Sequence, residues 1–93
     1  MGDRIDDRVI TVIKNYKSSR KWKELEELTG IDRDRWRSVS EGRVKVRTEE
    51  LEAVIKLYPK WAHWLTTGDV LPESGQTSPE WDEAEKLNES ERA

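Results

Sequence analysis

Residues 22–42 read WKELEELTGIDRDRWRSVSEG, which is the pattern of two short helices separated by a glycine. The first apolar run ends at Gly30, and glycine favours the left-handed conformation that ends a helix and turns the chain. Asp32 is a typical N-cap for a second helix of about ten residues, which closes at Gly42. Two helices joined by a tight glycine turn predict a helix-turn-helix motif.

Helical periodicity continues on both sides of this motif. Residues 4–16 and residues 49–58 each carry apolar side chains at spacings of three and four, and Thr48 is the expected N-cap of the second segment. A compact fifth helix closes at Gly68. The alternating residues 43–47 have no partner hairpin, so we expect an extended connection there. The expected apolar faces comprise Ile5, Val9, Val12, Ile13, Tyr16, Trp22, Leu25, Leu28, Leu51, Val54, Ile55, Tyr58, Trp61, Trp64 and Leu65.

The C-terminal quarter differs in composition from the rest. A chain of 93 residues has room for one domain and a tail, and we assign residues 1–70 to the domain and residues 71–93 to the tail. The tail opens with turn-forming residues, after which Ser78 and Pro79 favour the start of a helix. The apolar residues of that helix are Trp81, Ala84 and Leu87. So thin a stripe cannot fold alone, so we expect a segment that dimerises the chain or binds a protein partner, the alternative being a solubilising end without a partner.

Charge is distributed unevenly, which bears on the partner. The net charge is −3, but residues 1–47 hold 13 Lys and Arg against 9 Asp and Glu, whereas residues 48–93 hold 4 against 11. Affinity for a polyanion depends on where the cations lie and not on the net charge alone. The basic half is therefore compatible with a nucleic-acid partner. The chain has no cysteine and no apolar run of membrane-span length. We therefore expect a cytoplasmic protein without a membrane partner.

Residues 22–42 and 58–68 resemble the phage repressor/Cro family, the lambda repressor-like or Xre-type helix-turn-helix proteins. The resemblance spans about residues 4–68 and is closest to short prophage-encoded regulators. It implies an all-α, compact five-helix fold and sequence-specific binding of double-stranded DNA by a homodimeric transcriptional regulator. The matching positions are Leu25, Gly30, Ile31, Trp36, Val39 and Gly42, followed by Trp64, Leu65 and Gly68.

One position departs from the family pattern. Glu26 stands where these proteins usually have a small residue between the two motif helices. A carboxylate there must reach solvent or pair with a cation such as Arg35 or Arg37. The departure predicts an altered angle between the two helices rather than a different fold.

The helical period separates the predicted DNA contacts into two sets. With Trp36 and Val39 directed inward, the opposite face of the second motif helix should enter the major groove, where an arginine fork can bond both acceptors of guanine. Basic residues at the two ends of the motif would bind phosphates. An ordinary solvated face is the alternative for both sets. The predicted base contacts are Arg33, Asp34, Arg37 and Ser38, and the predicted phosphate contacts are Arg20, Lys21, Lys23, Arg43, Lys45 and Arg47.

Catalysis finds little support in the sequence. His63 is the single histidine, so no metal set or nucleophile–base pair can be assembled around it. We expect no enzyme activity, no metal and no cofactor. The remaining aromatic residues are expected in the core, with Trp22 either in the core or against a sugar-phosphate edge; the core set is Trp36, Tyr58, Trp61 and Trp64.

Two further functions remain open from the sequence. The chain could keep the helix-turn-helix fold and use its acidic half to bind another regulator. It could also be the antitoxin of a toxin–antitoxin pair, with the tail binding the toxin. DNA affinity with a steep salt dependence favours a regulator or an antitoxin over a pure protein-interaction module.

Overall fold

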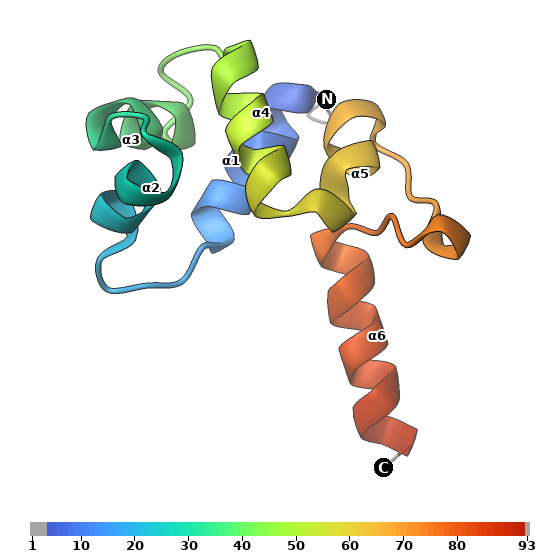
Figure 1. The fold of residues 1–93 in the computed structure, drawn as a ribbon. Coiled ribbons are helices and arrows are strands. Elements are labelled where there is room, and N and C mark those ends of the chain that lie inside the picture. The colour runs from blue at the N-terminus through green and yellow to red at the C-terminus, as the bar shows by residue number, and fades with distance from the viewer. Residues whose placement is uncertain (1–3, 93) are drawn as a thin grey trace.

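The computed structural model describes residues 4–92, with side chains to residue 89, and within that range it contains helices and no strand. This confirms the all-α class. In Figure 1 the helices up to residue 67 form one body, from which the C-terminal helix projects. The elements are α1 (Ile5–Asn15), α2 (Lys21–Thr29), α3 (Arg33–Ser40), α4 (Thr48–Leu57), the 3₁₀ helix η1 (Pro59–Trp61), α5 (Ala62–Thr67), the 3₁₀ helix η2 (Pro72–Ser74) and α6 (Pro79–Arg92).

The core lies where α1 packs against α3, α4 and α5, and Leu25 of α2 is buried in the same cluster. Apolar residues of α1 recur every three or four positions, so their side chains share one face and are buried together. Of the expected α2 stripe only Leu25 is buried, because Leu28 lies on the outer side and is 60% exposed. The buried apolar residues are Val9, Val12, Ile13, Leu25, Trp36, Val39, Val54 and Leu65.

The expected aromatic core is confirmed in part. Trp36 is fully buried, whereas the other three aromatic residues are half-buried and pack against the edge of the core. Tyr58 and Trp61 stack with ring centroids 4.4 Å apart and planes at 19°. This stack joins the end of α4 to η1 and so fixes where α5 begins.

The helix ends follow local chemistry, with one correction to the sequence analysis. The N-cap of α2 is Arg20, whose amide donates to Ser18 Oγ at 3.1 Å. Thr48 was expected to cap α4 but is its first residue. The residue before it is the N-cap, and the Arg47 amide donates to the Glu50 carboxylate at 2.7 Å. A carboxylate at the third helical position stabilises the start of a helix because it accepts from the N-cap amide, which is otherwise unpaired.

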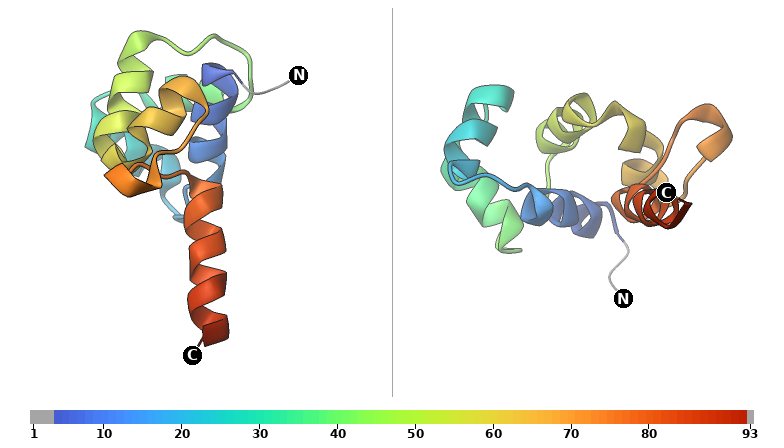
Figure 2. Two further views of the ribbon diagram at one scale, coloured as in Figure 1. Left: turned by 90° about the vertical axis from the view of Figure 1, so that its right-hand side faces the viewer. Right: turned by 90° about the horizontal axis from the view of Figure 1, so that it is seen from below.

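The C-terminal helix α6 begins as expected and then leaves the body. The Ser78 hydroxyl accepts a hydrogen bond from the Trp81 amide at 3.0 Å. The Asp82 carboxylate ties the first turn to η1, accepting from Trp61 Nε1 at 2.9 Å and pairing with Lys60 Nζ at 2.9 Å. Figure 1 and the left-hand view of Figure 2 show the rest of α6 extending away from the other helices.

The connection before α6 is bonded to the body. Leu71 and Gln76 form an isolated antiparallel bridge, the His63 amide donates to Gln76 Oε1 at 2.9 Å, and the Thr77 amide donates to the Lys60 carbonyl at 2.8 Å. These bonds hold the start of the tail against α5 and η1. The domain boundary near residue 70 stays a prediction.

Candidate nucleic-acid interface

The turn between α2 and α3 is built as the sequence predicts. Gly30 ends α2 in the left-handed conformation, with φ at 74°, and its amide donates to the Glu26 carbonyl at 2.8 Å. Asp32 caps α3, because its carboxylate accepts from the Asp34 amide at 2.7 Å. The helix-turn-helix is therefore formed by α2, Gly30 to Asp32, and α3.

Thr29 is a part of this turn that the sequence analysis missed. Its hydroxyl accepts from Trp36 Nε1 at 3.0 Å and from the Ile31 amide at 3.2 Å, and it donates to the Leu25 carbonyl at 2.6 Å. The buried indole of α3 thus has its polar atom satisfied by the last residue of α2. Its place in the sequence, as a hydroxyl residue directly before the glycine that ends the helix, could have indicated this role.

The outward face of α3 carries the predicted base contacts. Arg33, Asp34 and Arg37 are exposed and Ser38 is half-buried, whereas Trp36 and Val39 face the core. The exposed face is thus the one that the helical period predicts. Base contact by these four residues stays a prediction.

The Arg33 guanidinium is held by Glu26 of α2. Nε and Nη2 donate to Glu26 Oε1 at 3.1 and 2.7 Å, and the Arg33 amide donates to Oε2 at 3.1 Å. These hydrogen bonds hold the pKa of the Glu26 carboxyl below its usual range, so the carboxyl is charged at neutral pH. Glu26 pairs with a cation, as expected, but the cation is Arg33 and not Arg35 or Arg37, because the first residue of α3 bonds it across the turn.

Arg37 is held more loosely. Its Nη1 lies 3.6 Å from Asp34 Oδ1, and the guanidinium carbon lies 5.5 Å from the centre of the Trp22 ring. Lys21 Nζ lies 4.9 Å from the same ring, and burial lowers the pKa of Lys21. Half-buried Trp22 therefore brings two cations together beside the face of α3.

Arg35 has a different role from its neighbours. Nε and Nη2 bond the two Glu50 oxygens at 3.2 and 3.1 Å, and Nη2 also donates to the Lys45 carbonyl at 2.7 Å. Glu50 is 1% exposed. This network fastens α3 to α4 and to the connecting loop. Glu50 was missed from the sequence, although its place four residues before buried Val54 puts both on one helix face.

The predicted phosphate contacts flank the motif in two places. Those at the start of α2 are exposed apart from half-buried Lys21, and those in the loop from α3 to α4 are all exposed. Arg43 Nε lies 3.1 Å from Glu41 Oε1. Phosphate binding stays a prediction for the two groups, which are Arg20, Lys21 and Lys23 at the first place and Arg43, Lys45 and Arg47 at the second.

Glu24 fixes the approach to the motif. Its carboxylate accepts from the Tyr16 hydroxyl and the Ser18 hydroxyl, each at 2.8 Å. These bonds lower the pKa of Glu24 and raise the pKa of Tyr16. The end of α1 and the start of α2 are therefore fixed relative to each other.

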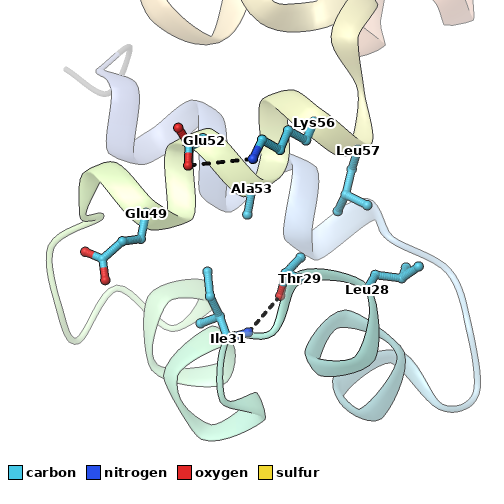
Figure 3. Close-up of a pocket in the computed structure, with 8 residues that line it drawn as sticks. All are labelled: Leu28, Thr29, Ile31, Glu49, Glu52, Ala53, Lys56 and Leu57. Carbon is cyan, nitrogen blue, oxygen red and sulfur yellow. Dashed lines mark hydrogen bonds and ion pairs between the residues drawn. The ribbon is translucent and has the colours of Figure 1, made fainter.

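A shallow groove of about 500 Å³ lies between the motif and α4. Figure 3 shows Ile31 pointing from the turn toward Ala53 and Leu57 of α4, with Glu52 and Lys56 on the outer side of α4, 3.9 Å apart. The lining of the groove is half apolar and half polar, and its apolar side chains pack the turn against α4. Among residues 4–92, no group of three or more acidic, histidine or cysteine side chains could hold a metal ion, and no helix is long and apolar enough to cross a membrane.

The fold and this motif define the class: an all-α helix-turn-helix protein. Among solved structures, Pf6r from the filamentous phage Pf6 of Pseudomonas aeruginosa PA01 is 35% identical to the chain, with a TM-score of 0.77. The match covers 89% of this chain and 94% of Pf6r. The chain therefore belongs to the same family as this phage protein. No family model and no curated protein matches it.

Proposed function

We propose that this protein binds double-stranded DNA in a sequence-specific way, as a phage or prophage transcriptional regulator of the repressor/Cro type. The observation that carries the proposal is the outward face of α3, where Arg33 and Arg37 stand exposed on the second helix of a helix-turn-helix. In this docking mode the second helix enters the major groove and basic residues at its flanks meet phosphates. Membership of the Pf6r family supports a phage origin.

The charge distribution agrees with DNA on one side of the molecule. Residues 69–93 hold 2 Lys and Arg against 8 Asp and Glu, so phosphate repels this segment. Figure 1 and the right-hand view of Figure 2 place α6 far from α2 and α3. The motif can therefore approach a duplex without bringing the acidic helix to it.

Selection of bound sequences from random duplexes, followed by titration of the full chain at several salt concentrations, tests the proposal. We expect a preferred sequence, and an affinity that falls with salt by a slope of about 0.9 for each phosphate contacted. Absence of any DNA binding would favour the alternative, a protein-interaction module. The protein is proposed to act by binding alone, with no catalytic step, metal or cofactor.

The regulator is proposed to act as a homodimer, because one motif reads only a few base pairs and two-fold pairing doubles the contacts. The exposed stripe of Trp81, Ala84 and Leu87 on α6 is the proposed surface, with Leu87 63% exposed. A helix of 14 residues is marginal by itself, and pairing would bury its apolar face.

The effect of salt separates self-pairing from capture of a basic partner. Residues 79–92 hold 6 Asp and Glu against 2 Lys and Arg, so two copies of α6 repel each other and salt should strengthen the dimer. Binding to a basic protein, including a toxin, should weaken with salt. Leu87→Asp should dissociate the dimer in sedimentation, and Leu28→Asp, at an exposed leucine of α2, should not. A dimer that survives Leu87→Asp would exclude this surface.

A further inference from the structure

Glu26 is an acidic residue on the face proposed to meet DNA, where its charge weakens binding to phosphate. Yet its carboxylate makes three hydrogen bonds, all to Arg33. Glu26 is 32% exposed and Arg33 46% exposed, so the pair lies at the surface without being fully solvated. Three bonds to one residue, across a turn, indicate a defined position for that arginine.

The pattern of bonds leaves one edge of the guanidinium free. An arginine has five N–H donors arranged as two forks, one formed by Nε and Nη2 and the other by Nη1 and Nη2. Glu26 occupies the first fork, and Nη1 makes no hydrogen bond to the part of the chain that the structure describes. The second fork has the spacing of the N7 and O6 acceptors of guanine.

The third bond fixes the base of the side chain. Because the Arg33 amide donates to Glu26 Oε2, one carboxylate holds both the backbone and the tip of this residue. An arginine held at both ends loses less conformational freedom when it binds than one that moves freely in solution. It also presents its free fork at a fixed angle to α3.

We infer that Glu26 is a specificity-determining positioning residue, which aims Arg33 at one guanine of the recognised site. The inference rests on the proposed function, and it adds which base the first residue of α3 recognises. Glu26 thus lowers the affinity for every duplex through its charge, and it raises the discrimination at one base pair by positioning Arg33. Its presence where a small residue is usual follows from this role.

Glu27 provides a matched control. It neighbours Glu26 on α2, carries the same charge and is exposed, and it has no hydrogen bond or ion pair within the described residues. Glu26→Ala and Glu27→Ala therefore remove the same charge from the same helix. Only Glu26→Ala frees Arg33.

The experiment measures dissociation constants of the full-length protein and its variants for the selected site, its single-base variants and a random duplex. Both Glu26→Ala and Glu27→Ala should tighten binding to the random duplex. Glu26→Ala alone should lose discrimination, by about five- to tenfold, at one guanine, which Arg33→Ala also ceases to read. Glu26→Gln, which keeps one acceptor oxygen, should lose less of this discrimination. It replaces Glu26→Ala in the test if that variant does not fold.

The outcomes separate the two proposals. Wild-type protein that binds all duplexes alike, or none, would overturn the proposed function and this inference with it. Wild-type protein that discriminates, with Glu26→Ala discriminating equally well at every position, would overturn the inference alone. Equal loss for Glu26→Ala and Glu27→Ala would likewise show that charge, and not the position of Arg33, is responsible.

Discussion

Arg33 and Arg35 lie two residues apart on α3, and each bonds a glutamate, but in opposite surroundings. Arg33 meets Glu26 at the surface, where 46% and 32% of their side chains are exposed. Arg35 meets Glu50 in the interior, where the exposed fractions are 18% and 2%. The same pair of groups therefore occurs once in solvent and once largely out of it.

The difference in burial gives the two ion pairs different roles. An exposed pair contributes little to stability, since water solvates each partner well without the other. A buried pair is costly to break, because the remaining charge is left without water. The buried pair thus holds α3 and α4 together, and the exposed pair is free to serve recognition.

Glu50→Ala should give the largest effect on stability. It leaves Arg35 with the Lys45 carbonyl as its remaining partner and removes the acceptor of the Arg47 amide. We expect a loss of about 2–4 kcal/mol in the free energy of unfolding, measured by urea denaturation, which is less than for a fully buried pair because Arg35 is partly exposed. Glu49→Ala, one residue earlier and exposed, should cost less than about 1 kcal/mol. Similar losses for both would mean that Arg35 is well solvated.

Arg37 extends the comparison to a third arginine of α3, whose partner Asp34 is 82% exposed. Arg37→Ala should cost about 1–3 kcal/mol in binding to the preferred site and weaken discrimination, because its fork is proposed to read a base. Lys45→Ala should weaken all duplexes alike and lower the salt slope by about one. Titrations on preferred and random duplexes check both, and an equal loss on the two duplexes for Arg37→Ala would contradict base reading.

The smallest effect concerns the pH dependence of the exposed pair. The pKa of Glu26 is lowered in the folded protein, so its contribution to stability is fully present above the unfolded pKa, about 4.3, and is lost as pH falls through the folded value. The difference in unfolding free energy between wild type and Glu26→Gln should therefore be constant from pH 5 to 7 and shrink below about pH 4. A difference that grows on acidification would reverse the assigned sign.

Much of the fold was predictable because local chemistry decides it. Gly30 and Asp32 define the turn through backbone conformation and capping, and neither depends on distant residues. The burial of Val9 and Ile13 follows from periodicity alone. The cap of α4 was misplaced by one residue because the Glu50 carboxylate bonds the amide of Arg47, so the helix begins at Thr48 and the residue before it is the N-cap.

The pairing of charges was not predictable in the same way. Residues 22–42 alone hold four glutamates and three arginines, and sequence spacing does not say which of these charges pair with each other or with a residue outside the motif. Arg35 and Glu50 are separated by 15 positions, and only the packing of α3 against α4 brings them together. Glu26 has the first residue of α3 within reach because the turn is tight. The sequence could predict which face of α3 points outward, whereas it could not predict which of the side chains on that face are held by an ion pair.

The outward reach of α6 gives the proposed operator a measurable geometry. Two copies joined through α6 hold their recognition helices far apart, since α3 and α6 lie in separate parts of a molecule 42 Å long. A rigid pair meets both half-sites only when they face the same side of the duplex, which recurs about every 10–10.5 base pairs. Affinity should then rise and fall as spacer base pairs are added, and the best spacer length would measure the span of the dimer.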